Sequence, residues 1–145
     1  SWITVLRKRD GYAALFDNFN AEKIARYSDK KLDKILEDSR IIRNRLKVYG
    51  ARKNARAFLA VQEEFGSFAD YIWGFVDGVP VQNSWKSIKE VPATTPVSDA
   101  MSKDMKKRGF TFVGSTILYA HMQATGMVND HTTDCFRYKE CKKLA

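Results

Sequence analysis

The sequence predicts an all-α fold, and three observations support this prediction. Apolar residues recur three and four positions apart along most of the chain, which is the period of an amphipathic helix. Ser and Asn precede several of these stretches, as N-caps do, and Gly follows others, as at helix ends. No stretch alternates convincingly between apolar and polar residues, so we expect no β-strand.

The expected helices follow one another along the chain. The first apolar repeat consists of Trp2, Val5, Leu6, Ala13 and Phe16, and it predicts a helical start. The further expected helices cover 21–27, 29–38, 44–64, 68–76, 99–107 and about 115–126. Their expected N-caps are Asn20, Ser28, Ser67 and Ser98, and their expected ends include Gly66, Gly109 and Gly126.

Two of these helical segments carry packing predictions. In the segment 21–38, the side chains expected to face the core are Ile24, Leu32, Ile35 and Leu36. In the helix 44–64, the expected inward stripe consists of Leu46, Ala55, Phe58, Leu59 and Gln62.

All three prolines lie in an irregular segment at about 77–97. A link of this length without helical periodicity is uncommon in a small domain, so we expect an ordered loop with a covering or functional role. Trp85 is the side chain expected to hold this loop against the body of the protein.

Composition limits the classes of partner. The 145 residues are most simply one domain, 1–145, and are enough to bury a core. A net charge of +8 favours an anionic partner, most commonly nucleic acid, although a merely basic protein fits too. No apolar run approaches the roughly 20 residues that cross a bilayer, so we expect no membrane partner. Two cysteines form no disulfide framework, which is typical of a reducing cytoplasm.

The segment 29–64 has the layout of a helix-hairpin-helix, because a short helix meets a longer one through a tight link at 39–43. Such a hairpin points backbone N–H groups and the positive end of its second helix at a phosphate. Arg43, Arg45 and Lys47 add positive charge there, although a solvated basic helix face would look the same. Arg40 stands where such turns usually need Gly, so we expect the turn to be strained or differently shaped.

Two further features could carry chemistry. Trp2 is either a core residue or a platform on which an extruded base stacks. His131 and Cys135 are four residues apart, as two ligands of a tetrahedral zinc site can be. They make a half-site at about 129–141, which needs two more ligands from Cys141, His121 or residues outside this chain. Asp130 beside them is either a partner of these ligands or a cap.

Four stretches carry a family resemblance: SWITVLRKRDGY (1–12), IIRNRLK (41–47), SKDMKKRGFTFVGSTILYAHMQA (102–124) and GMVNDHTTDC (126–135). Together they resemble bacterial 3-methyladenine DNA glycosylase I, a family of the helix-hairpin-helix superfamily. The resemblance implies a monomeric, all-α, helix-hairpin-helix DNA glycosylase-like domain. It implies hydrolysis of the N-glycosidic bond of a flipped-out 3-methyladenine in double-stranded DNA, with no lyase step.

The resemblance also implies roles for particular residues. Trp2 matches the base-stacking residue, Ala120 and His121 lie near the base, and His131 and Cys135 match two ligands of a structural zinc. The hairpin of the family corresponds to Ile42, Arg43, Asn44, Arg45 and Lys47. His121 replaces an apolar aromatic residue of the family, so it is either a new base contact or a bland variant.

The family's recognition Glu and its other two zinc ligands lie in a segment before the position of Ser1. We therefore expect this chain to lack the N-terminal catalytic segment, which leaves its catalytic residue unknown. A DNA glycosylase is the leading interpretation. The alternatives are a non-catalytic helix-hairpin-helix DNA-binding module, and a basic structural protein without affinity for DNA.

Overall fold

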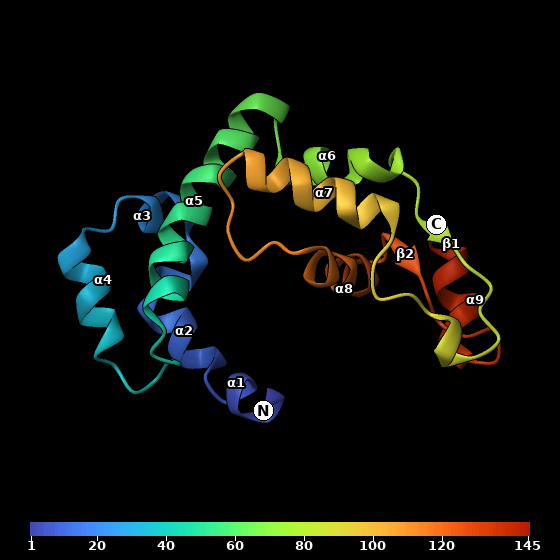
Figure 1. Cartoon of the computed structure of the whole chain (residues 1–145), viewed down its shortest axis with the longest axis horizontal. Coiled ribbons are helices and arrows are strands. Elements are labelled where there is room, and N and C mark those ends of the chain that lie inside the picture. The colour runs from blue at the N-terminus through green and yellow to red at the C-terminus, as the bar shows by residue number, and fades with distance from the viewer. The chain divides into compact units, whose positions relative to one another are not determined.

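Helices dominate the structure, a computed structural model that describes every residue from Ser1 to Ala145 (Figure 1). The α-helices are α1 (Trp2–Leu6), α2 (Arg9–Leu15), α3 (Ala21–Ala25), α4 (Asp29–Leu36), α5 (Arg45–Phe65), α6 (Phe68–Trp73), α7 (Pro96–Lys107), α8 (Ser115–Thr125) and α9 (Phe136–Lys143). Three 3₁₀ helices are η1 (Asp17–Phe19), η2 (Gly74–Val76) and η3 (Ile88–Glu90). The all-α prediction is confirmed.

The expectation of no strand is wrong in one place. The strands β1 (Val81–Gln82) and β2 (Val128–Asn129) pair in parallel, with Val81 opposite Val128. Each strand has only two residues, which is too short for an alternating pattern to be visible in the sequence.

The chain forms two compact units. The first unit consists of Ser1–Glu64 together with Gly109–Phe112. The second unit consists of Phe65–Arg108 and Val113–Ala145.

The core of the first unit lies between α2, α3, α4 and α5. Its buried side chains are Phe16, Ile24, Tyr27, Leu32, Ile35, Ile41, Val48 and Ala55. Asn20 and Ser28 cap α3 and α4 as predicted, because their side chains accept hydrogen bonds from the backbone of Lys23 and Lys31. Ile24, Leu32 and Ile35 are buried, which confirms the inward face predicted for 21–38. Leu36 is the exception, because it is only half-buried.

The inward stripe predicted for α5 is wrong at Leu46 and Gln62, which are exposed, whereas Ala55 is buried and Phe58 and Leu59 are half-buried. Leu46 is 75% exposed, and the buried side chains of the helix include Val48, Ala55, Ala57 and Val61. Apolar residues occur on more than one side of this helix, so periodicity alone does not choose between them. The side of α5 that faces the core is set by tertiary packing. Val48 and Ala55 pack into the cluster that contains Leu32 and Ile41.

In the second unit, α7 packs against α8 and η2. The main buried side chains here are Met101, Met105, Leu118, Tyr119, Met122 and Met127. The predicted cap of α7 is wrong, because Thr95 caps the helix and Pro96 is its first residue. Ser98 instead completes a capping box, in which its hydroxyl accepts a hydrogen bond from the Thr95 backbone.

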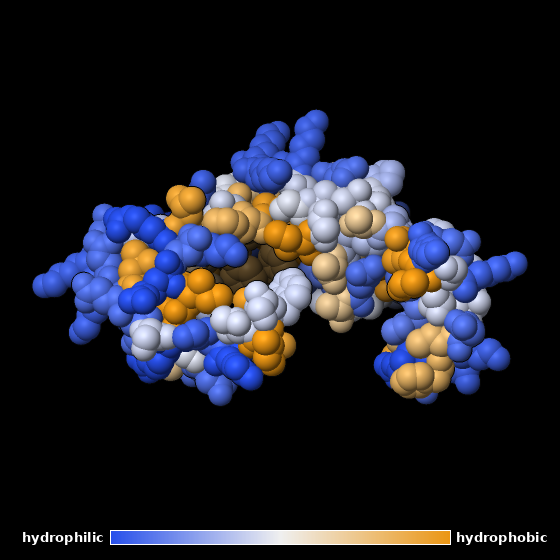
Figure 2. Space-filling view, turned by 60° about the horizontal axis from the view of Figure 1, so that its bottom comes forward, coloured by the Kyte–Doolittle hydropathy of each residue, from blue (hydrophilic) through white to orange (hydrophobic).

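Hydrophilic residues cover most of the face in Figure 2, and separate groups of apolar residues lie among them. Apolar side chains that are more than half exposed include Trp2, Ile3 and Leu6 on α1, and Phe136 and Leu144 near the end of the chain. Even α5, with 21 residues, lacks the apolar stretch that a membrane crossing requires, and so do the other helices.

Candidate functional site

The α4–α5 connection, residues 37–44, and the first turn of α5 hold the predicted DNA-binding residues. The connection ends at Asn44, whose side-chain oxygen accepts a hydrogen bond from the Lys47 backbone at 3.1 Å and so caps α5. Ile41 is only 2% exposed and anchors the connection in the core. The connection is therefore held at both of these points, while Ile42 and Arg43 remain at the surface.

The strain expected at Arg40 is absent, because Arg40 is not among the residues with positive φ. Its backbone N–H and its guanidinium both donate to the Asp38 carboxylate, at 2.9 and 2.8 Å. These hydrogen bonds hold the pKa of Asp38 at about 2, below its usual range. An Asp-based turn thus replaces the turn that would have needed Gly.

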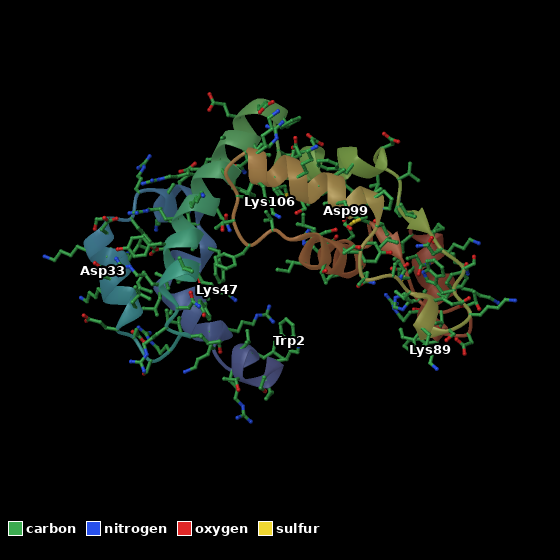
Figure 3. All side chains as sticks on the ribbon, viewed as in Figure 1. Trp2, Asp33, Lys47, Lys89, Asp99 and Lys106 are labelled. Atoms are coloured by element: carbon green, nitrogen blue, oxygen red, sulfur yellow. The ribbon has the colours of Figure 1, made fainter.

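The three predicted cations of this region differ in their partners. Arg43 is exposed and has no ion pair or side-chain hydrogen bond. Arg45 contacts Asp33 of α4 at 3.0 Å, and Lys47 lies 5.5 Å from the centre of the Phe112 ring. Figure 3 shows Asp33 on α4 and Lys47 on α5. Arg43 is therefore the cation with most freedom to meet a ligand.

Helix α2 packs directly against the α4–α5 connection, a contact that no sequence pattern predicted. The Tyr12 hydroxyl accepts a hydrogen bond from the Ile42 N–H at 3.2 Å, and Lys8 donates to the Ser39 carbonyl. Gly11 lies against Arg40 so closely that an added Cβ would come within 2.7 Å of the Arg40 Cβ. The only sign of this contact in the sequence is Gly11 itself, which stands between charged residues and Tyr12.

Trp2 lies on the first turn of α1 with 84% of its surface exposed. Its ring projects from α1 in Figure 3. The alternative that Trp2 is a core residue is therefore wrong in this structure, and its ring is accessible for stacking. Trp2 and the α4–α5 connection both belong to the first unit.

The other predicted base-binding residues lie on α8 in the second unit. Ala120 and His121 are both exposed, while the neighbouring Tyr119 and Met122 are buried. Ile117, one turn before His121, is 57% exposed, so this face of α8 is accessible and partly apolar. Burial of Tyr119 and Met122 therefore fixes the rotation of α8 that exposes Ala120 and His121.

Asp130 organises the region around the predicted metal ligands. Its carboxylate accepts hydrogen bonds from Trp85 and Asn83, which lie between β1 and η3, and from Tyr119 and Gln123 of α8. Burial alone would raise the pKa of Asp130, but these hydrogen bonds hold it below its usual value. The prediction that Trp85 holds the loop is confirmed, and Asp130 is the residue that it contacts.

His131 and Cys135 lie close together, with 3.7 Å between the His131 Nδ1 and the Cys135 Sγ. Zn–S bonds of about 2.3 Å and Zn–N bonds of about 2.1 Å at a tetrahedral angle separate such atoms by about 3.6 Å. The pair therefore fits two corners of a zinc site. No group of three or more possible ligands is gathered in the structure, so Cys141 and His121 do not complete it.

Comparison with known proteins places this geometry in a family. The family model for methyladenine glycosylase matches residues 1–138. The DNA-3-methyladenine glycosylase 1 of Escherichia coli (strain K12) is 44% identical over 138 residues, which are 95% of this chain and 74% of that protein. Both the family model and this relative thus span nearly the whole chain.

Solved structures agree with the sequence matches. A crystal structure of 3-methyladenine DNA glycosylase I aligns with a TM-score of 0.87 and 48% identity, covering 94% of this chain and 75% of that one. A 3-methyladenine DNA glycosylase I in complex with 3-methyladenine aligns with a TM-score of 0.88 and 27% identity, covering 94% of this chain and 73% of that one.

Proposed function

This chain belongs to the methyladenine glycosylase family, and we propose that it acts in DNA base-excision repair. It hydrolyses the N-glycosidic bond of 3-methyladenine in alkylated double-stranded DNA and performs no lyase step. The match to the family model over residues 1–138 is the observation that carries this proposal. The name of the relative with 44% identity describes the same activity.

The chemistry demands little acid catalysis from the protein. Methylation at N3 gives the purine a positive charge, so the base leaves as a neutral molecule when the bond breaks. The protein must extrude the base, stack against it and stabilise the transition state. The exposed ring of Trp2 supports a stacking role, because a cationic base gains a cation–π attraction there.

The α4–α5 connection binds the DNA backbone as a helix-hairpin-helix. The Asn44 side chain accepts from the Lys47 N–H, which leaves the N–H groups of Arg45 and Leu46 at the positive end of the α5 dipole. Arg43 adds a cation without an ion pair next to these groups. The Ile42 N–H is excluded from this role, because it donates to Tyr12.

His131 and Cys135 hold two corners of a structural zinc. The separation of 3.7 Å between their ligand atoms supports this assignment. In this chain the pair leaves two zinc positions to other ligands, so we expect weak binding. Titration with Co²⁺, followed by its thiolate absorption band, tests the pair. The band should disappear with Cys135→Ser and persist with Cys141→Ser. A band that is lost with Cys141→Ser but kept with Cys135→Ser would contradict the assignment.

Release of free 3-methyladenine from methylated duplex DNA tests the activity. We expect release above the spontaneous rate, with an intact strand that breaks only after alkali treatment, because no lyase step occurs. Tight duplex binding without base release would instead favour a non-catalytic DNA-binding module. Absence of both would leave a basic protein without this function.

A further inference from the structure

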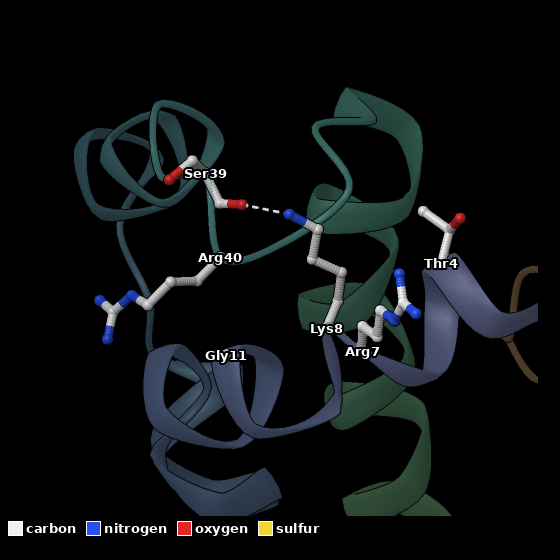
Figure 4. Close-up of a pocket in the computed structure, with 6 residues that line it drawn as sticks. All are labelled: Thr4, Arg7, Lys8, Gly11, Ser39 and Arg40. Atoms are coloured by element: carbon white, nitrogen blue, oxygen red, sulfur yellow. Dashed lines mark hydrogen bonds between the residues drawn. The ribbon is translucent and has the colours of Figure 1, made fainter.

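A cavity of about 420 Å³ lies in the first unit, between the α1–α2 junction and the α4–α5 connection (Figure 4). Its lining residues are Thr4, Arg7, Lys8, Gly11, Ser39 and Arg40. Three of these six residues carry positive charge, and none carries negative charge. The cavity is separate from the N–H groups at the start of α5.

The cations that line this cavity are not all neutralised. Arg40 is paired with Asp38 at 2.8 Å and points away from Arg7 and Lys8 (Figure 4). Arg7 has no ion pair and no side-chain hydrogen bond. Lys8 makes a single hydrogen bond, to the Ser39 carbonyl, and an ammonium group has three donors. Two positive charges and several donors therefore remain available to a ligand.

The walls of the cavity are held in place by contacts that do not involve a ligand. Gly11 lies in contact with the Arg40 backbone, and Tyr12 bonds to the Ile42 N–H. The Lys8 bond to Ser39 spans the two walls. A site whose donors are already fixed loses less entropy on binding, so these contacts favour recognition of a compact anion.

We propose that this cavity binds a phosphate group of the DNA backbone, through the Arg7 guanidinium, the free ammonium donors of Lys8 and the Thr4 hydroxyl. The proposal rests on the proposed function, because it takes DNA as the ligand. Ser39 and Arg40 lead directly to Arg43 in the sequence, so the cavity continues the basic surface of the α4–α5 connection.

The cavity lies next to α1, the helix that carries Trp2, so a phosphate bound there would also affect the position of Trp2. Arg7 follows the last residue of α1, and α1 begins with Trp2. A phosphate held by Arg7 and Lys8 therefore fixes α1 to the DNA that the connection contacts. Arg7 is a positioning residue for Trp2 as well as a backbone contact.

The test uses Arg7→Gln, because Arg7 is exposed and its loss breaks no internal bond. Affinity for an unmodified duplex is measured at several salt concentrations. The salt slope should fall by about 0.9, which corresponds to one lost phosphate contact and to about eightfold weaker binding at 0.1 M salt if affinity at 1 M is unchanged. Arg9→Gln is the matched control, because Arg9 is also exposed and unpaired but does not line the cavity.

A second variant distinguishes a specific contact in the cavity from a general effect of positive charge on DNA binding. Thr4→Val removes a hydroxyl without changing charge, so it should weaken duplex binding while the salt slope stays unchanged. Equal slopes for Arg7→Gln and Arg9→Gln would overturn the proposal, and so would a wild-type chain that does not bind the duplex. A slope change for Arg7→Gln in a chain that releases no 3-methyladenine would support the phosphate site and reject the glycosylase activity.

Discussion

Gly11 on α2 and Arg40 in the α4–α5 connection are in direct backbone contact. A Cβ on Gly11 would lie 2.7 Å from the Arg40 Cβ and closer still to the Arg40 carbonyl oxygen. Real side chains do not tolerate such distances, so one of the two segments would have to move. The absence of a side chain at Gly11 therefore allows Arg40 to occupy the turn.

Gly11→Ala should destabilise the protein, although Ala is normally better than Gly inside a helix by about 1 kcal/mol. Overpacking at the Arg40 contact should reverse the sign, with a loss of about 1–3 kcal/mol. Chemical denaturation measures the change. Gly74→Ala is the matched control, because Gly74 is helical and no atom lies within 4 Å of its added Cβ. Equal effects of the two changes would show that the contact is unimportant.

Arg43→Ala should weaken duplex binding similarly for all sequences and lower the salt slope by about one unit. Arg45→Ala and Lys47→Ala should weaken it as well, but Arg45→Ala should have a smaller effect. Arg45 must leave Asp33 before it meets a phosphate, whereas Arg43 has no such partner. A fluorescence titration at several salt concentrations measures both quantities. Lys103→Ala, an exposed cation on α7, should leave the slope nearly unchanged.

Trp2→Ala should reduce the release of 3-methyladenine far more than it reduces stability. An 84% exposed side chain contributes little to the core, so the change in unfolding free energy should stay within about 0.5 kcal/mol. Phe136→Ala provides the comparison, since Phe136 is an 80% exposed aromatic residue on α9. If both variants release the base at the wild-type rate, Trp2 has no stacking role.

Stability of the second unit should fall in acid because of Asp104. Hydrogen bonds from Tyr71, at 2.6 Å, and from Arg108, at 2.7 Å, hold the pKa of Asp104 below its ordinary value of 3.8. The unfolded chain then binds the proton more readily than the folded chain does. The contribution of Asp104 is therefore fully present above pH 3.8 and is lost as pH falls below it.

Thermal melts between pH 2 and pH 6 test this expectation, because this range spans the ordinary pKa of 3.8. Asp104→Asn should lower the melting temperature at pH 6 and reduce its dependence on pH. Tyr71→Phe should reduce the same dependence by removing one donor. Parallel melting curves for the wild type and both variants would exclude the Tyr71–Asp104 pair as the source.

The sequence was sufficient where local chemistry decides the structure. Asn20, Ser28 and Ser67 cap their helices as predicted, because a cap depends on residues three positions apart. Thr95 was missed for Ser98, since two hydroxyl residues near one helix start give similar local signals. The pairing of Val81 with Val128 depends on residues far apart in the chain, which no local pattern records.

The residues of the candidate site also fall into two groups, those that a local pattern predicts and those that it does not. Trp2, Arg43, His131 and Cys135 were found by residue type and spacing. The contacts of Gly11, Tyr12 and Lys8 with the α4–α5 connection were not, because they cross about 30 residues of sequence and depend on backbone approach. The charge of Arg7 and Lys8 was visible, but the cavity that they line was not.

The hydrogen bonds between Asn54 and Thr111 bear on how the protein folds as it is made. The Asn54 amide donates to the Thr111 carbonyl at 3.0 Å and accepts from its N–H at 2.8 Å. Residues 109–112 belong to the first unit, yet a ribosome makes them only after residues 65–108. The first unit therefore cannot complete its packing during synthesis until more than two-thirds of the chain has been translated, so nascent chains arrested before that point should be more open to proteases.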